Sequence, residues 1–137
     1  MKGLFSIGSG TGVLEWLIKN NDQGLVVQCS ERKESLESGC QCIWGSSLIE
    51  TRFVSPTDGP EATIPVPKEL ALFQCYGNGP QVLPAYLKEY QGDVVIVIGQ
   101  LLGTRPSPDF MKTNDDWKTE KLGVPYCEAY YSVRKRS

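Results

Sequence analysis

The sequence predicts an α/β protein with three layers, in which helices cover both faces of a mostly parallel sheet. Short apolar runs of strand length recur along the chain, and segments of helix length separate them. The run at 94–98 is continuous and β-branched, which is typical of a strand that is covered on both faces. A glycine-rich turn at 8–12 joins the first apolar run directly to an amphipathic pattern. The strand nearest the C-terminal end is expected to be antiparallel.

Length and composition indicate one globular domain over residues 1–137. The hydrophobic content of 40% and the charged content of 22% are ordinary for such a domain. No apolar run reaches the roughly 18 residues of a membrane-spanning helix, so no membrane segment is expected. The first residues do not resemble a secretory signal, and the five cysteines are an odd number. A reduced, cytoplasmic protein is therefore expected.

Charge and residue types exclude several classes of function. The net charge of −2 gives no strong nucleic-acid signal, because such proteins carry a basic face. The chain contains no histidine, so it has no imidazole base and no histidine-containing zinc site. Cys40 and Cys42 are spaced too tightly for a usual zinc knuckle. No metal site is predicted.

The first half of the chain alternates between strand and helix patterns. Its expected elements are a strand at 3–7, a helix at 13–19, a strand at 25–29, a charged helix-compatible segment at 30–37 and a strand at 40–44. The polar run 20–24 is expected to end the helix. The proline-rich segment 50–67 predicts a surface connection, and a lid over a site is the alternative.

The second half continues the alternation. Its expected elements are a strand at 70–76, a helix at 81–90, a strand at 94–99, a short helix from 106 to 117 and a strand at 124–133. Pro84 suits the first turn of its helix. The last strand is rich in tyrosine, and as an exposed edge it could pair across a homodimer.

The glycines at 8, 10 and 12 predict a loop that binds a ligand. Glycine allows a positive φ and lets the backbone approach a ligand closely. Amides at the following helix N-terminus face negative charge or hydrogen-bond acceptors. The dinucleotide pattern has its third glycine where this chain has Val13, which disfavours a nicotinamide or flavin oxidoreductase. No Gly-Lys-Ser/Thr follows, so a Walker loop is excluded.

The run from Phe5 to Gly12 resembles the first motif of class I S-adenosylmethionine-dependent methyltransferases. The order of elements is similar to that family over most of the chain. The resemblance implies a Rossmann-like fold, S-adenosylmethionine as cofactor and methyl transfer to an acceptor that the sequence does not name. It also implies that the loop lines the methionine and ribose of the cofactor. These loop residues are Gly8, Ser9, Gly10, Thr11 and Gly12.

The resemblance assigns four further residues to the cofactor. Glu31, at the end of the second strand, would accept hydrogen bonds from the ribose hydroxyls, with a solvated charge as the alternative. Trp44 and Gly45 would lie at the adenine, and Trp44 in the core is the alternative. Gln74 would bind the amino group of the cofactor. The family usually has an acidic residue two positions before the first glycine, where this chain has Ser6, and Cys29 stands where the ribose acid most often falls.

The segment after the fourth strand carries the candidate catalytic residues. Tyr76 could orient a nucleophile, and Asn78 could accept a hydrogen bond from one or bind the cofactor's amino group. A plain strand-to-helix turn is the alternative. The segment lacks the Asn/Asp-Pro-Pro-Tyr signature, so base methylation gains no support. A methyltransferase acting on a small molecule or protein is expected, and the alternative is a catalytically silent module that serves as a partner subunit or binding domain.

Overall fold

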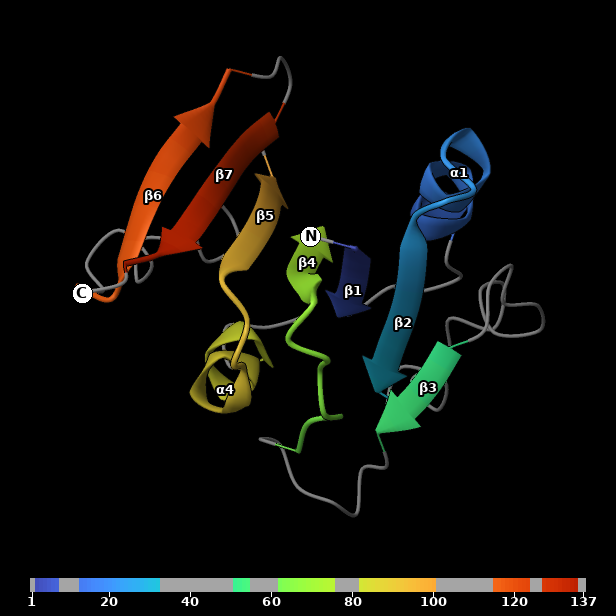
Figure 1. Ribbon diagram of the computed structural model, residues 1–137, viewed down its shortest axis with the longest axis horizontal. Helices are drawn as coiled ribbons and strands as arrows, with labels where there is room; N and C mark the ends of the chain where they lie inside the picture. Colours follow the sequence, from blue (N-terminus) through green and yellow to red (C-terminus); the bar gives the residue numbers. More distant parts are fainter. Residues whose placement is uncertain are drawn as a thin grey trace.

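The computed structural model describes residues 2–7, 13–32, 51–54, 62–75, 82–100, 115–123 and 127–135. Within these ranges, seven strands form one sheet and two helices flank it (Figure 1). The strands are β1 (Gly3–Ile7), β2 (Val26–Arg32), β3 (Thr51–Val54), β4 (Leu70–Cys75), β5 (Val94–Gln100), β6 (Trp117–Leu122) and β7 (Cys127–Arg134). The helices are α1 (Val13–Asn21) and α4 (Val82–Glu89).

The strand order across the sheet is β3-β2-β1-β4-β5-β7-β6. Every pair from β3 to β5 is parallel, whereas β7 runs antiparallel to both β5 and β6. The predicted α/β class, with a mostly parallel sheet and an antiparallel C-terminal strand, is confirmed.

The two helices cover opposite faces of the sheet (Figure 1). The chain moves outward from β1 to β2 through α1, and in the other direction from β4 to β5 through α4. Right-handed crossovers in opposite directions place their helices on opposite sides. The core residues divide accordingly. On the α4 side they include Phe5, Ile7, Leu72, Leu83, Tyr86 and Val95, and on the α1 side Leu4, Ala71 and Phe73, with Ile18 packed against them.

Arg134 fixes the antiparallel end of the sheet to the turn after α4. Its guanidinium lies 4.5 Å from the centre of the Trp117 ring, and that ring stacks on Tyr90 at 6.5 Å. Its Nη2 donates to the Tyr90 carbonyl and its Nε to the Gly92 carbonyl, both at 2.9 Å. A planar fork of donors above an aromatic ring is a geometry that arginine provides and lysine does not.

The structure corrects the predicted elements in several places. Thr51–Val54 forms β3 beside β2, although the segment from residue 50 was predicted as a connection. Four residues are too few for a periodic pattern, and the neighbouring strand supplies the pairing. Trp117 begins β6 and does not end a helix. Ser30 to Arg32 continue β2, and α1 extends to Asn21. The strand predicted at 40–44 lies outside the described residues.

The tyrosine-rich strand β7 is not an edge strand. It pairs with β5 on one side and with β6 on the other, so its backbone groups are already used. The prediction that this strand is an exposed edge was therefore wrong, and the homodimer stays a prediction. Strand β6 was not predicted, because its exposed positions are mostly charged (Lys118, Glu120 and Lys121) and give no alternation of apolar and polar residues.

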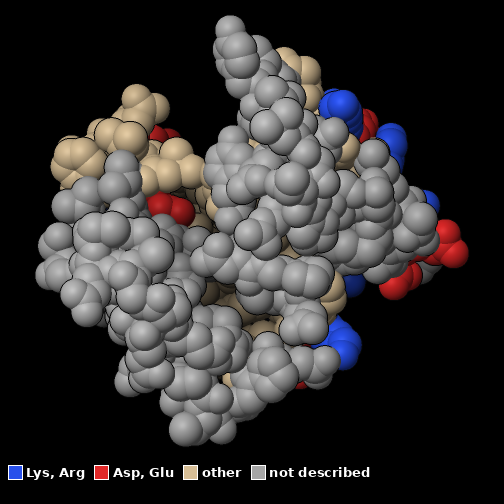
Figure 2. Space-filling view, turned by 180° about the vertical axis from the view of Figure 1, so that it is seen from behind, with Lys and Arg blue, Asp and Glu red and all other residues tan. Residues whose placement is uncertain are grey.

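Neither α1 nor α4, the helices in the described part of the chain, is long and apolar enough to cross a membrane. On the face drawn in Figure 2, the described basic side chains lie among acidic ones.

Candidate functional site

The candidate site lies at the carboxyl ends of β1 and β4, which are neighbours at the centre of the sheet. The connections that follow these two strands leave in opposite directions, and ligands of open α/β sheets bind outside such a switch point. Ile7 ends β1 and is paired with Gln74 of β4 on one side and with Ser30 of β2 on the other. The glycine loop 8–12 therefore begins at this point, although its own residues lie outside the described ranges.

A buried carboxylate stands at the base of that loop. Glu15, in the first turn of α1, is only 3% exposed, and Ser6 of β1 is 1% exposed. The Ser6 hydroxyl donates a hydrogen bond of 2.8 Å to Glu15 Oε1. The other oxygen, Oε2, is buried and has no hydrogen-bond partner among the residues that the structure describes. Within the described ranges, one oxygen of this buried carboxylate therefore accepts from Ser6 and the other has no donor.

The helical spacing of α1 explains how an acidic residue comes to be buried. Glu15 and Ile18 are three residues apart and share a face, and Ile18 packs against the core of the sheet. Leu14, Trp16 and Leu17 are exposed instead, at 38%, 42% and 52%. The positive end of the helix dipole partly compensates a carboxylate in the first turn. The site residues predicted from the sequence did not include Glu15. The pattern that could have indicated it is an acidic residue three positions before Ile18, on the same face of the helix.

A hydroxyl pair supports the opposite face of the same edge. Ser30 Oγ lies 3.1 Å from the Tyr86 hydroxyl of α4, and it donates to the Ser6 carbonyl at 3.5 Å. The backbone N–H of Ile64 donates to the Tyr86 hydroxyl at 3.4 Å. These contacts join β1, β2, α4 and the segment before β4. The end of β1 is thus held from both sides of the sheet.

The structure places two of the predicted site residues. Gln74 is buried at 8% exposure and is paired with Ile7, so it lies at the switch point. Glu31 lies inside β2, next to Ser30, with its Cα paired to Phe53 of β3. It therefore precedes the end of the strand at Arg32. The other predicted site residues lie outside the described ranges, namely Gly8, Ser9, Gly10, Thr11, Gly12, Trp44, Gly45, Tyr76 and Asn78.

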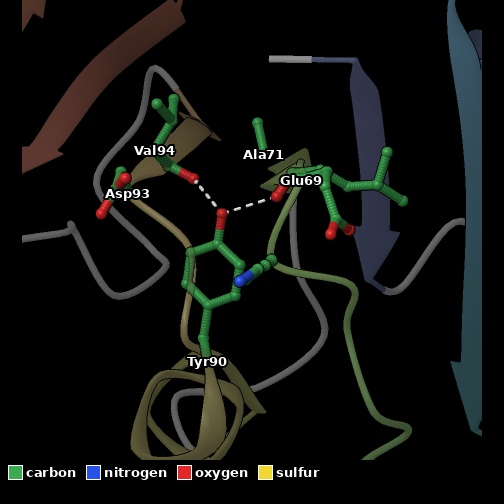
Figure 3. Close-up of a pocket in the computed structure, with 7 residues that line it drawn as sticks. Glu69, Ala71, Tyr90, Asp93 and Val94 are labelled. Atoms are coloured by element: carbon green, nitrogen blue, oxygen red, sulfur yellow. Dashed lines mark hydrogen bonds between the residues drawn. The ribbon is translucent and has the colours of Figure 1, made fainter.

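Two hollows among the described residues lie at the amino ends of the strands, away from the switch point. One, of about 220 Å³, lies between the starts of β4 and β5 (Figure 3). The other, of about 430 Å³, is lined by Lys2, Asp22, Gly24, Leu25 and Val26. In the first hollow the Tyr90 hydroxyl lies 2.6 Å from the Leu70 carbonyl and 2.9 Å from the Val94 carbonyl. Burial raises the pKa of Tyr90. Because its proton is already engaged with backbone, this tyrosine is a structural group.

Among the described residues, no three His, Cys, Asp or Glu side chains are grouped so that they could hold a metal ion.

No protein-family model and no curated protein matches this sequence. Several solved structures match its fold. Precorrin-6y C5,15-methyltransferase from Geobacter metallireducens has a TM-score of 0.58 and 13% identity, over 97% of this chain and 79% of its own. The E81Q mutant of MtNAS in complex with S-adenosylmethionine has a TM-score of 0.61 and 11% identity, over 98% of this chain and 55% of its own. PigF with S-adenosylhomocysteine has a TM-score of 0.61 and 13% identity, over 98% of this chain and 50% of its own.

The chain thus spans about half the length of the latter two proteins and more of the first. Identities this low show a shared fold and leave activity to be established. The strand order, the helix on each face and the antiparallel β7 agree with that likeness over nearly the whole chain. The chain has the Rossmann-like fold of the class I S-adenosylmethionine-dependent methyltransferases.

Proposed function

We propose that this protein binds S-adenosylmethionine at the carboxyl edge of β1 and β4 and transfers the methyl group to a small-molecule or protein acceptor. The observation that carries the proposal is the strand order, which makes the glycine loop 8–12 the connection at the switch point. Solved structures with the same fold were obtained with S-adenosylmethionine and with S-adenosylhomocysteine. The buried, half-satisfied carboxylate of Glu15 at the base of the loop also fits a ligand that donates hydrogen bonds.

The proposed chemistry asks the protein mainly for positioning. When bound, the cofactor supplies a methyl group on a sulfonium, which is open to in-line displacement. Holding an acceptor in line with that group lowers the barrier without an imidazole base or a metal ion. The absence of histidine from the chain is compatible with this reaction.

The proposed binding roles follow the fold. The loop residues from Gly8 to Gly12 line the methionine and ribose, and Glu31 accepts hydrogen bonds from the ribose hydroxyls. Trp44 and Gly45 contact the adenine. Gln74, a buried amide beside the end of β1, binds the amino group of the cofactor. Tyr76 and Asn78 directly follow β4, where they would face the acceptor.

A second candidate function is a catalytically silent module that keeps the cofactor site and serves as a partner subunit. One observation favours it. Ser6 replaces the acidic residue that the first motif usually carries.

Calorimetry tests the binding claim. The full chain is titrated with S-adenosylmethionine, with S-adenosylhomocysteine and with NAD. We expect micromolar binding of the two adenosyl ligands and none of NAD. Gly10→Arg should abolish that binding, since an arginine side chain would fill the space at the loop. Gly123→Arg is the matched control, because nothing lies within 4 Å of a Cβ at position 123. Binding of NAD alone would contradict the proposal.

A transfer assay separates the enzyme from the silent module. The protein is incubated with S-adenosylmethionine labelled on the methyl group and with pools of metabolites and of proteins. Label that appears in an acceptor, and disappears with Gly10→Arg, supports the methyltransferase. Retained cofactor binding with no transfer into any pool favours the silent module.

A further inference from the structure

We propose that Glu15 binds the cationic α-amino group of the cofactor's methionine part, in place of the acidic residue that is missing at position 6. The inference rests on the proposed function and names one of its binding groups. Its starting point is a single atom, Glu15 Oε2, which is buried and has no donor among the described residues.

Burying this carboxylate costs free energy unless a further partner binds it. Glu15 is 3% exposed, and among the described residues the Ser6 hydroxyl is its one hydrogen-bond donor, at 2.8 Å. A buried carboxylate loses its hydration, and a single neutral donor replaces only part of it. The ion pairs formed among the described residues include no Lys or Arg at Glu15. A group that brings both positive charge and N–H donors would complete its coordination.

The position of Glu15 determines which ligand can bring such a group. Ser6 is the residue before the end of β1, and Glu15 is the third residue of α1. The pair therefore joins the strand that precedes residues 8–12 to the helix that follows them, at the switch point where the ligand is proposed to bind. The cofactor carries two positive centres. The sulfonium has no hydrogen to donate, whereas the α-ammonium has three, so the ammonium is the group that suits Oε2.

The pair also accounts for the serine at position 6. A carboxylate projecting from β1 at this position would meet the carboxylate of Glu15, and two adjacent buried carboxylates repel each other. Serine instead donates to Glu15 Oε1 and leaves Oε2 for the ligand. In this chain the helix, and not the strand, supplies the negative charge.

A cycle of two proteins and two ligands tests the inference. The wild-type chain and Glu15→Gln are each titrated with S-adenosylhomocysteine and with desamino-S-adenosylhomocysteine, which lacks the α-ammonium group. Glutamine has the shape of glutamate and can still accept from Ser6, so the fold is retained. In the wild type, removal of the ammonium should weaken binding by about 10- to 100-fold. In Glu15→Gln the same removal should weaken binding at least about 3-fold less than in the wild type, because the two deletions are coupled. The effect that remains is that of the contact proposed for Gln74.

The matched control is Glu69→Gln, which removes the same charge from an exposed position at the amino edge of β4. It should keep the wild-type ratio between the two ligands. If Glu15→Gln also keeps the wild-type ratio between the two ligands, the inference is overturned, even if both ligands bind more weakly. Glu15 would then stabilise the structure and would not bind the amino group. If the wild-type chain binds neither ligand, the proposed function itself fails, and this outcome is distinct from a retained ratio.

Discussion

Ser6 and Glu15 show how the chemistry of one side chain is decided by its neighbour across the fold. Nine residues separate them in the sequence, and a hydrogen bond of 2.8 Å joins them in the structure. Ser6 departs from the usual first motif, but nothing in the sequence connects it to Glu15. That connection depends on which helical face meets the sheet, and on α1 the apolar residues Leu14, Trp16 and Leu17 are exposed while Glu15 is buried.

Tyr90 offers a test at the same scale. Its hydroxyl lies 2.6 Å and 2.9 Å from the carbonyls of Leu70 and Val94, which ties the starts of β4 and β5 together. Tyr90→Phe removes the donor and leaves buried carbonyls without it. We expect a loss of about 1–2 kcal/mol in the free energy of unfolding at neutral pH, measured by urea denaturation.

The contribution of Tyr90 to the free energy of unfolding depends on pH in a direction that can be stated. Burial raises the pKa of Tyr90 above its ordinary value of 10.0, so the folded chain holds a proton that the unfolded chain releases. The stabilisation from Tyr90 is therefore complete below about pH 10 and declines as the pH rises through the higher folded pKa. Above about pH 10, the free energy of unfolding of Tyr90→Phe should decline less steeply with pH than that of the wild type. An identical decline in both proteins would contradict this account.

Tyr131→Phe is the control for Tyr90→Phe. Tyr131 lies on β7 and is partly exposed, and its loss of a hydroxyl should change the unfolding free energy by less than about 0.5 kcal/mol.

At the scale of elements, the parallel strands show which patterns can be read from a sequence. The continuous apolar runs at β1, β4 and β5 predicted strands, because both faces of these strands are covered by core residues. Pro84 lies in the first turn of α4, as its fixed φ favours. Strands β3 and β6 were not predicted. They lie at the two ends of the sheet, where neighbours supply the pairing and exposed residues give no periodic pattern.

The pairing of β1 with β2 can be tested at Gly3. A Cβ at this position would collide with the backbone carbonyl of Val26, the residue that pairs with Gly3. Backbone cannot move aside as a side chain can, so the two strands would have to separate. Gly3→Ala should therefore lower the free energy of unfolding by about 1–3 kcal/mol, measured by urea denaturation.

Gly123→Ala is the matched control for Gly3→Ala, since an added Cβ there meets nothing within 4 Å. It should unfold within about 0.5 kcal/mol of the wild type. If both variants were equally stable, the close approach of β1 and β2 at Gly3 would be wrong.

At the scale of the whole molecule, the strand order carries the functional argument. The sequence predicted the fold class and the place of the glycine loop after the first strand. It could not predict that Gln74 and Ser30 flank the end of β1, because sheet register depends on pairing between distant segments. Nor could it show that the hollows between Lys68 and Val94 and around Val26 belong to the opposite edge.

The proposed function depends on binding of an adenosyl ligand at the carboxyl edge of β1 and β4. A crystal structure of the full chain grown with S-adenosylhomocysteine is the decisive measurement. We expect density for the nucleoside over the loop 8–12, with the amino acid part reaching the end of β1. Density for the ligand only at the amino edge, in the hollow beside Tyr90, would contradict it.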